Sequence, residues 1–440
     1  MRKCYPYFWV FLLSFVVQTV FIFNFKGKPA EADAKNYYNI SQSVIAEKSS
    51  ILDGEINVRH PPIYPFFLAG VFYLFGNKII VAQLSQVFLI AFSCMIIMHL
   101  GKTVFNEKIG LISGLLMAIH PVIVTSSFRL LTEALSIFQV VVFSYVLTCA
   151  YLKKKVYLYV LSGIILGLLT LTRPILVLFP FLLFILIPLK YRSLPGIRYV
   201  CYLMVPFVLI VSAWTLRNYC QTKLFIPIAS GGELEIWNGS YFPGDGYSDH
   251  PKTAEARNKL FDKFNAKNRL SPEYLNEGKN KAYYIYFLNM QDFRKEGFNN
   301  IREHPFKYLS LFPKKILYLY VGSYSFQFDI QDSFRDLKSK NAQKRTEYYW
   351  FKLLIKVTIL FLTAATLFFT TLGLLGSMKN RNFDVTSWIL LYWTAFFLLF
   401  SPLTRYSMPI IPLMIMTAAR GVSILSGKTG ITNSRIKYVV

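Results

Sequence analysis

Residues 26–76 read KGKPAEADAKNYYNISQSVIAEKSSILDGEINVRHPPIYPFFLAGVFYLFG and interrupt a chain that is otherwise dominated by long apolar runs. The runs Tyr7–Phe25 and Ile79–Leu100 lie on either side, and each is long enough to cross a bilayer. Of the 440 residues, 54% are hydrophobic and 16% are charged, whereas ordinary soluble domains carry roughly 25% charged residues. The pattern predicts a membrane protein in which residues 26–78 form the first loop outside the bilayer.

The formal net charge of +25 could point to a nucleic-acid partner. The basic residues are nevertheless spread over loops and the ends of apolar runs, and they form no basic face with interleaved aromatic residues. We therefore expect no nucleic acid, and instead a membrane surface or an anionic lipid as partner. The cysteines show no paired spacing and predict neither a metal site nor a disulfide framework; they are Cys4, Cys94, Cys149, Cys201 and Cys220.

About ten apolar runs predict an all-α polytopic bundle, although several are shorter than the ~20 residues that a membrane-spanning helix needs. The first run also has the general look of a signal peptide, but no small-residue cleavage site follows Phe25, which favours a retained anchor. The predicted spans are Tyr7–Phe25, Ile79–Leu100, Ile109–Phe128, Ala134–Leu152, Val156–Thr172, Ile175–Leu189, Tyr199–Leu216, Phe351–Leu375, Trp388–Phe400 and Met408–Ala419.

The distribution of lysine and arginine predicts that both termini face the cytoplasm, because basic residues collect beside short cytoplasmic loops. With this orientation, nearly every short basic loop lies on the inner side, and the first span alone is ambiguous. The residues concerned are Lys102, Lys108, Lys153, Lys154, Lys155, Lys190, Arg192, Arg198, Lys379, Arg381, Lys428, Arg435 and Lys437.

The same orientation divides the chain into three regions. Residues 1–220 form an N-terminal transmembrane module that includes the loop 26–78, residues 221–345 form an outer region, and residues 346–440 form the last spans and a cytoplasmic tail. Turn residues near Gly231 and helices from about Thr253 onward are expected in the outer region. Residues 305–326 predict an interfacial helix rather than a span, because Pro313, Lys314 and Lys315 interrupt them.

Four arginines border apolar runs on the predicted outer side, and each requires a reason because arginine at bilayer depth is costly. For any single residue, snorkelling to the interface is the simpler explanation. As a group beside short outer loops they favour a shared anionic ligand, and a lipid phosphate suits the paired hydrogen bonds of a guanidinium. The residues are Arg129, Arg173, Arg217 and Arg405.

Two carboxylates are candidate site residues. Asp33 follows the first span closely, and in a helical turn Tyr37 would lie on the same side of it. A carboxylate there could take a proton from an acceptor hydroxyl, although a solvated loop aspartate is the commoner role for such a residue. Glu133 follows Arg129 by four residues, so the two could neutralise each other across one helical turn, or Glu133 could position a substrate hydroxyl.

Several motifs, in this order, resemble the GT-C glycosyltransferases, specifically the bacterial relatives of protein O-mannosyltransferases and aminoarabinose transferases. They are Asp33-Ala-Lys-Asn-Tyr37, Arg59-His-Pro-Pro-Ile-Tyr-Pro65, Leu130-Leu-Thr-Glu133, Thr172-Arg-Pro174, Arg217-Asn-Tyr219, Ile236-Trp-Asn-Gly239 and Arg405-Tyr-Ser-Met-Pro409. The resemblance covers most of the chain except residues 246–344.

The resemblance implies a GT-C bundle, a sugar donor on a polyprenyl or dolichyl phosphate, inversion at the anomeric carbon and an active site outside the membrane. Asp33 matches the family's general base and Glu133 its second acidic residue, while Ala32 and Glu31 depart from the residues that many members have before Asp33. In the first loop, Tyr37, Arg59, His60 and Tyr64 are the expected substrate-binding residues, together with the four arginines.

Two other functions stay open. A transporter or flippase of lipid-linked sugar would use the same donor, but transporters usually have charges near the bilayer midplane and repeated halves, neither of which is visible here. A polysaccharide polymerase or ligase differs mainly in family pattern. The scheme requires no metal, and a divalent ion on Asp33, Glu31 or Glu133 is an alternative. The acceptor could be a lipid, a glycan or a protein.

Overall fold

A computed structural model gives the structure of residues 5–25, 27–184, 195–270, 282–322, 349–379 and 384–426. Some residues of the sequence predictions lie outside this described part of the chain, so the basic loops are only partly represented. They are Cys4, Lys26, Lys190, Arg192, Arg381, Lys428, Arg435 and Lys437.

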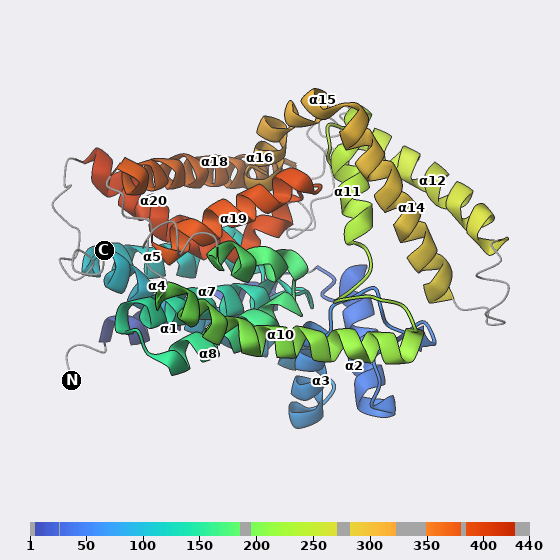
Figure 1. The fold of residues 1–440 in the computed structure, drawn as a ribbon. Helices are drawn as coiled ribbons and strands as arrows, with labels where there is room; N and C mark the ends of the chain where they lie inside the picture. Colours follow the sequence, from blue (N-terminus) through green and yellow to red (C-terminus); the bar gives the residue numbers. More distant parts are fainter. Residues whose placement is uncertain are drawn as a thin grey trace.

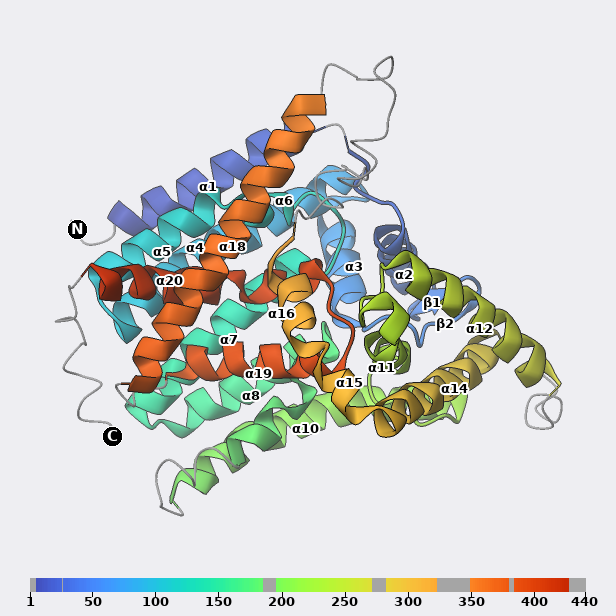
Figure 2. The same ribbon diagram turned by 90° about the horizontal axis from the view of Figure 1, so that it is seen from above.

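Most of the described chain forms a bundle of helices that run roughly along one direction (Figures 1 and 2). The first helix begins and the last helix ends at the same end of this bundle, as the prediction of both termini on one side requires. The helices of the bundle are α1 (Tyr5–Asn24), α4 (Ile79–Val104), α5 (Glu107–Ile119), α7 (Glu133–Lys153), α8 (Val156–Thr170), α10 (Pro195–Thr222), α18 (Tyr349–Lys379), α19 (Val385–Leu399) and α20 (Ile411–Leu425).

Six helices within the described residues are long and apolar enough to cross a membrane. Four shorter apolar helices accompany them, among them α8 and α19. The prediction of an all-α, multi-pass membrane protein is confirmed. The six long helices are Tyr5–Asn24, Ile79–Val104, Glu133–Lys153, Ile197–Thr222, Leu353–Lys379 and Thr404–Leu425.

The third predicted span, 109–128, is wrong in its length. Helix α5 ends at Ile119, His120 has an extended backbone, and Pro121 begins the separate short helix α6 (Pro121–Thr125). Proline offers no backbone N–H and disfavours the helical conformation of the residue before it, so the helix breaks at this point. The chain then turns through residues 126–132 and enters α7 at Glu133.

Helices of the two segments predicted to lie outside the membrane are at the other end of the bundle, opposite the start of α1 and the end of α20 (Figure 2). Helix α2 (Asp33–Glu47) and α3 (Ile63–Phe75) come from the first loop, and Figure 1 shows α3 crossing the direction of the bundle helices. The later segment forms α11 (Gly232–Ser240), η2 (Phe242–Gly244), α12 (Pro251–Arg269) and α14 (Ala282–Glu303). Helices beyond Thr253 are confirmed, whereas the predicted turn at Gly231 is followed at once by a helix.

The first loop also contains a small hairpin that the all-α prediction did not include. Strands β1 (Ile51–Leu52) and β2 (Glu55–Ile56) pair antiparallel. Asp53 and Gly54 connect them with positive φ angles of 55° and 78°. An Asp-Gly pair is the preferred sequence for such a turn, because both central residues must adopt a left-handed conformation.

Residues 305–322 form two short helices, α15 (Pro305–Leu309) and α16 (Phe312–Tyr320), neither of which is among the candidate spans. Residues 323–326 of the predicted interfacial helix lie outside the described part. Lys315 is buried, and its Nζ donates a hydrogen bond of 2.8 Å to the carbonyl oxygen of Leu398 at the end of α19. Burial lowers the pKa of Lys315 to about 7. These helices therefore fix the end of α19.

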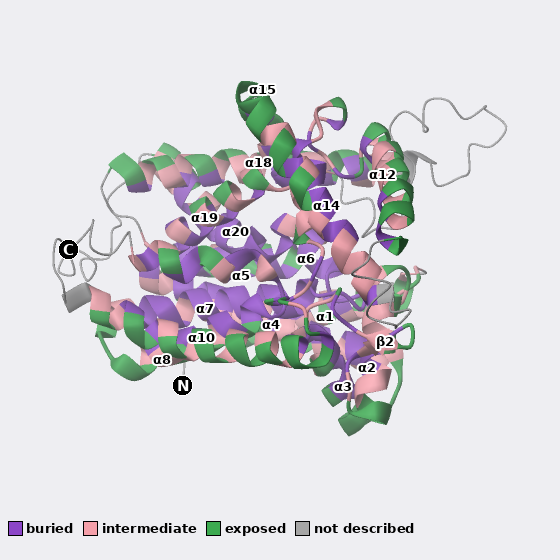
Figure 3. Cartoon of the chain, turned by 45° about the vertical axis from the view of Figure 1, so that its right-hand side comes forward, coloured by how far each residue is buried: buried purple, intermediate pink, exposed green. Residues whose placement is uncertain are grey.

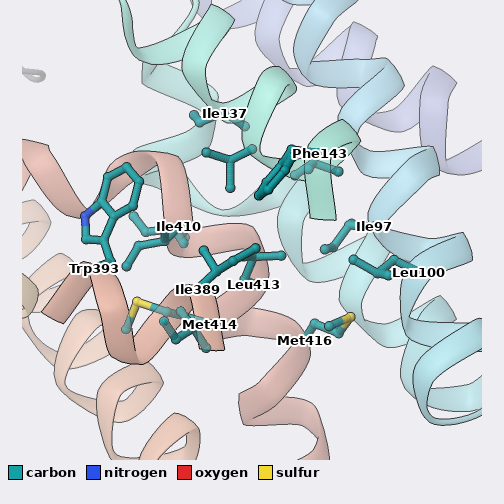
Figure 4. Close-up of a cluster of buried hydrophobic side chains, with 14 of the residues drawn as sticks. Ile97, Leu100, Ile137, Phe143, Ile389, Trp393, Ile410, Leu413, Met414 and Met416 are labelled. Atoms are coloured by element: carbon teal, nitrogen blue, oxygen red, sulfur yellow. The ribbon is translucent and has the colours of Figure 1, made fainter. Parts of the chain in front are cut away.

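The core of the bundle gathers around α7, where buried residues are concentrated (Figure 3). Figure 4 shows Phe143 of α7 and Trp393 of α19 among the buried side chains that fill the space between α4, α7, α19 and α20. Trp393 also donates a hydrogen bond of 3.0 Å from Nε1 to the carbonyl oxygen of Tyr406. Tyr406 lies in the 3-10 helix η4 (Thr404–Ile410), so the core fixes the backbone of this segment.

Glycines allow α18 and α20 to pack closely. A methyl group added at Gly421 of α20 would meet the carbonyl oxygen of Phe369 in α18, and one added at Gly373 would meet that of Thr417. Small residues at such contacts let the backbones of membrane helices approach each other, which is a main source of their packing energy.

We predict that Gly421→Ala lowers the thermal unfolding temperature of the purified protein in detergent by several degrees. The added methyl group forces α18 and α20 apart, and such overpacking costs about 1–3 kcal/mol. Gly70→Ala in α3 is the matched control, because a methyl group there meets nothing within 4 Å. An equal loss in the two variants, or none in Gly421→Ala, would contradict the close packing.

Candidate active site

An ion pair joins the first loop to the end of the chain. Asp33 is the first residue of α2, and its Oδ2 accepts a hydrogen bond of 2.9 Å from an NH2 group of Arg405 in η4. The side chains are 44% and 29% exposed, so a ligand can reach both. Ala32 has a φ of 52°, a conformation that favours glycine, and it turns the chain into α2. The first predicted carboxylate thus faces a predicted arginine.

A second ion pair is buried beside the first helix turn of α7. Glu133 Oε1 lies 2.8 Å from an NH2 group of Arg173, and the side chains are only 3% and 9% exposed. Arg173 also donates from Nε to the hydroxyl of Thr132 at 3.0 Å. The helix N-terminus stabilises the negative charge of Glu133. Arg129 and Glu133 do not share one helix as predicted, because α7 begins at Glu133 and Arg129 lies in the turn before it. An ion pair between these two residues stays a prediction.

Tyr37 of α2 is influenced by the charges of both ion pairs. Burial raises the pKa of its hydroxyl, the charges of Asp33 and Glu133 raise it further, and the guanidinium groups of Arg173 and Arg405 oppose them. All four charged groups are therefore close enough to act on one phenol. Tyr37 follows Asp33 by one helical turn, and the prediction that the two lie on the same side of α2 agrees with this arrangement.

The rings of His60 and Tyr64 pack against the ring of Tyr37. Their ring centroids lie 5.0 and 5.1 Å from that of Tyr37, both in edge-to-face contact. Burial lowers the pKa of His60, and the charge of Asp33 partly offsets this effect. The Asn36 amide donates to His60 Nε2 at 3.4 Å. His60 is therefore a packed residue that shapes the loop.

Asn57 holds the turn that presents His60. Its Oδ1 accepts hydrogen bonds from the backbone N–H groups of Arg59 and His60, and its Nδ2 donates to the carbonyl oxygen of His60 at 2.9 Å. Arg59 itself is exposed, and its guanidinium lies 4.6 Å above the ring of Tyr286 in α14. Its predicted role in substrate binding stays a prediction, and its contact here is with the outer helices.

Tyr64 and Arg129 are connected through a residue that the sequence analysis missed. The Tyr64 hydroxyl donates to Gln86 Oε1 at 2.9 Å, and Gln86 Nε2 donates to the carbonyl oxygens of Ser127 and Arg129. Tyr64 and Arg129 are both buried. An amide side chain within the apolar run 79–100 was the available signal, because such a group needs partners inside the bundle.

Arg217 has different surroundings from Arg173 and Arg405. It lies above the ring of Trp214 at 4.6 Å and donates to Asn218 Oδ1 at 3.1 Å and to the carbonyl oxygen of Asn57 at 3.4 Å. These contacts join α10 to the first loop. The structure thus brings Arg173 and Arg405 together around Tyr37, and a ligand shared by all four arginines stays a prediction.

Glu31, the alternative first-loop carboxylate, is exposed and lies 3.9 Å from Lys28. Asp33 is therefore the acidic residue of this loop that faces the arginines. Within the described residues, no three histidine, cysteine, aspartate or glutamate side chains are grouped so that they could hold a metal ion. Asp33 and Glu133, two of the carboxylates considered for a divalent ion, are each paired with an arginine.

Comparison with known proteins gives a family match for part of the bundle. Residues 59–216 match the family model described as dolichyl-phosphate-mannose-protein mannosyltransferase. A comparison with the curated proteins gives no match. The matched region runs from Arg59 through the Glu133–Arg173 pair to Leu216 in α10, so it includes one of the two ion pairs.

Solved structures share the fold. The oligosaccharyltransferase from Archaeoglobus fulgidus in its apo form matches with a TM-score of 0.52 and 14% identity, over 97% of this chain and 51% of that one. AglB from the same organism, in complex with an inhibitory peptide and a dolichol-phosphate, matches with a TM-score of 0.51 and 14% identity, over 99% and 54%.

ArnT from Cupriavidus metallidurans, bound to undecaprenyl phosphate, has 13% identity and a TM-score of 0.45, over 94% of this chain and 78% of that one. The chain spans about half the length of the archaeal enzymes. The family match and the shared fold together confirm the predicted resemblance: this chain has the fold of the GT-C glycosyltransferases.

We predict that Glu133→Gln destabilises the protein strongly. The variant leaves the Arg173 charge buried without its counterion, which costs about 3–5 kcal/mol. The double variant Glu133→Gln with Arg173→Met removes that charge and should recover part of the loss in a thermal unfolding experiment. Glu31→Gln, in an exposed pair, is the control and should leave the unfolding temperature unchanged. A double variant no more stable than Glu133→Gln would refute the pairing.

Proposed function

We propose that this protein is a membrane glycosyltransferase that moves a sugar from a polyprenyl phosphate to a hydroxyl of an acceptor, with inversion at the anomeric carbon. The observation that carries the proposal is the Asp33–Arg405 ion pair between α2 and η4, together with the buried Glu133–Arg173 pair. The family match at residues 59–216 and the dolichol-phosphate that AglB binds support a lipid phosphate as the donor group.

In the proposed reaction, Asp33 takes the proton of the acceptor hydroxyl as its oxygen forms a bond to the anomeric carbon. The bond between that carbon and the phosphate oxygen breaks, and polyprenyl phosphate leaves with the electron pair. Negative charge grows on the leaving phosphate, so fixed guanidinium groups stabilise the transition state more than the ground state. Arg405 is the accessible cation for this role, and Arg173 adds positive charge behind it.

The Asp33–Arg405 pair also suggests how the donor prepares the base. A carboxylate and a phosphate oxygen bind a guanidinium in the same way. When the donor phosphate binds Arg405, it therefore competes with Asp33 and releases that carboxylate to face the acceptor hydroxyl. The base becomes available only when a donor is present.

The later of the two segments, residues 221–345, contacts the first loop. The backbone N–H of Tyr283 donates to Glu55 Oε2 at 2.8 Å, and that of Ser230 donates to the carbonyl oxygen of Val58 at 2.7 Å. We propose that this end of the bundle is the extracytoplasmic face, in line with the distribution of lysine and arginine. The acceptor, whether lipid, glycan or protein, would then approach beside α11 and α14.

We predict that Asp33→Asn abolishes transfer while binding of undecaprenyl phosphate is retained or strengthened. Loss of the general base should reduce the rate by at least ~100-fold, whereas Arg405 loses its competitor and remains free for the phosphate. Transfer is measured in detergent with a panel of radiolabelled undecaprenyl-phosphate sugars, and binding with the bare lipid phosphate. Arg405→Gln should reduce transfer and, unlike Asp33→Asn, should also weaken binding of the bare lipid.

Glu31→Gln is the matched control for Asp33→Asn, because it neutralises a carboxylate of the same loop that faces solvent. It should transfer sugar at the parental rate. Parental transfer by Asp33→Asn would remove Asp33 as the base. A parent protein that moves labelled lipid across vesicle membranes but releases no polyprenyl phosphate would instead be a flippase.

A further inference from the structure

Helix α11 is hydrogen-bonded to the chain just before η4, the segment that contains Arg405. The backbone N–H of Ser401 donates to the carbonyl oxygen of Glu235 at 3.0 Å. A methyl group added at Gly239 would lie 2.7 Å from the carbonyl carbon of Phe400, so this helix can approach so closely only with glycine at that position. The side of α11 that bears Glu235 is therefore held against the connection between α19 and η4.

Three polar atoms at this junction are shut off from solvent and make no hydrogen bond of ordinary geometry within the described part of the chain. They are Oε2 of Glu235, Oγ of Ser401 and Nε of Arg405. The great majority of buried polar atoms in folded proteins have a hydrogen-bond partner, so such atoms in a native structure need an explanation. These atoms lie on both sides of the contact between α11 and the segment that leads to Arg405, and Arg405 pairs with the proposed base Asp33. This arrangement points to a ligand.

The chemistry of these atoms indicates what that ligand carries. The carboxylate oxygen of Glu235 accepts a hydrogen bond, Arg405 Nε donates one, and the Ser401 hydroxyl does both. At the Nε of Arg405 a phosphate would be repelled by the Glu235 carboxylate, whereas the donor phosphate of the proposed reaction replaces Asp33 at the NH2 group of the same guanidinium. Sugar hydroxyls each donate and accept, so they match the donors and acceptors that these three atoms offer.

Burial raises the pKa of Glu235 to about 7. The polar side chain of Asn238 and the positive charges of Arg257 and Arg405 lower this pKa and offset part of the effect. Near neutral pH the carboxyl group is therefore found in both protonation states, and it can either donate or accept. This property matches hydroxyl recognition, where the same group can serve in either role, better than it matches a fixed ion pair.

We propose that Glu235, Ser401 and the Nε of Arg405 form a subsite that binds the hydroxyl groups of a sugar beside Asp33. This inference rests on the proposed glycosyltransferase function and adds the chemical class of the group that α11 recognises. The sugar can come from either reactant, the donor or a glycan acceptor, since the chemistry of the hydroxyls is the same in both.

The test compares Glu235→Ala with Glu233→Ala, a carboxylate of the same helix turn whose Oε2 accepts from the N–H of Gly231. Each purified full-length variant is assayed with bare undecaprenyl phosphate, with undecaprenyl-phosphate sugars and with free glycan acceptors. Binding of the bare lipid reports that the variant is folded and that the phosphate site exists. If Glu235→Ala loses this binding, the isosteric Glu235→Gln replaces it.

A donor-sugar subsite predicts that Glu235→Ala binds the sugar-loaded lipid ~10-fold more weakly, the effect of one lost hydrogen bond to a charged group, while the bare lipid binds normally. A glycan-acceptor subsite predicts normal binding of both lipids and a KM for the acceptor that rises by a similar factor. Glu233→Ala should show neither effect. Unchanged donor binding and unchanged acceptor KM would overturn the subsite, whereas a parent protein that binds no lipid phosphate would instead refute the proposed function.

Discussion

The structure depends on one constraint: a charged side chain in or near a membrane needs a partner of opposite charge. Arg405 and Asp33 lie 372 positions apart in the sequence and meet at the end of the bundle, and Arg173 and Glu133 meet behind them. The buried pair is strongly coupled to stability, because loss of either partner leaves a charge without compensation. The accessible pair costs less to separate, so it is the one that a ligand can open. The two pairs thus differ in burial, and that difference assigns them different roles.

The positions of these charges come from the apolar core and from the breaks in the helices. Pro121 ends the straight course of the third apolar run, so the chain turns and Glu133 starts α7 near α2. Trp393 fills the core and holds the backbone of Tyr406, which fixes the neighbouring Arg405. Lys315 and Tyr308 bind the last carbonyls of α19 and fix the approach to the same segment. The packing of the apolar core therefore holds Glu133 and Arg405 in one orientation.

Much of this fold could be predicted from the sequence, because apolar runs, prolines and glycines act locally. The positions of most apolar helices, the first loop and the helices after Thr253 followed from patterns within single segments, although only six of the helices in the described residues are long enough to cross a membrane, against about ten predicted spans. The arginines were recognisable because charge beside an apolar run is rare, whereas Asp33 was recognised by its place after the first span and by the family resemblance. The ion pair between Glu133 and Arg173, the helix at 232–240 and the role proposed for Glu235 depend on contacts between distant segments. One sequence without its relatives contains no local signal for such contacts.

The most direct test of this account is an experimentally determined structure of the protein with undecaprenyl phosphate bound. Our account predicts phosphate oxygens within hydrogen-bond distance of the Arg405 guanidinium, and an Asp33 carboxylate that has left Arg405 and faces an open position beside the phosphate. A phosphate bound away from Arg405, with the Asp33–Arg405 pair intact, would contradict it.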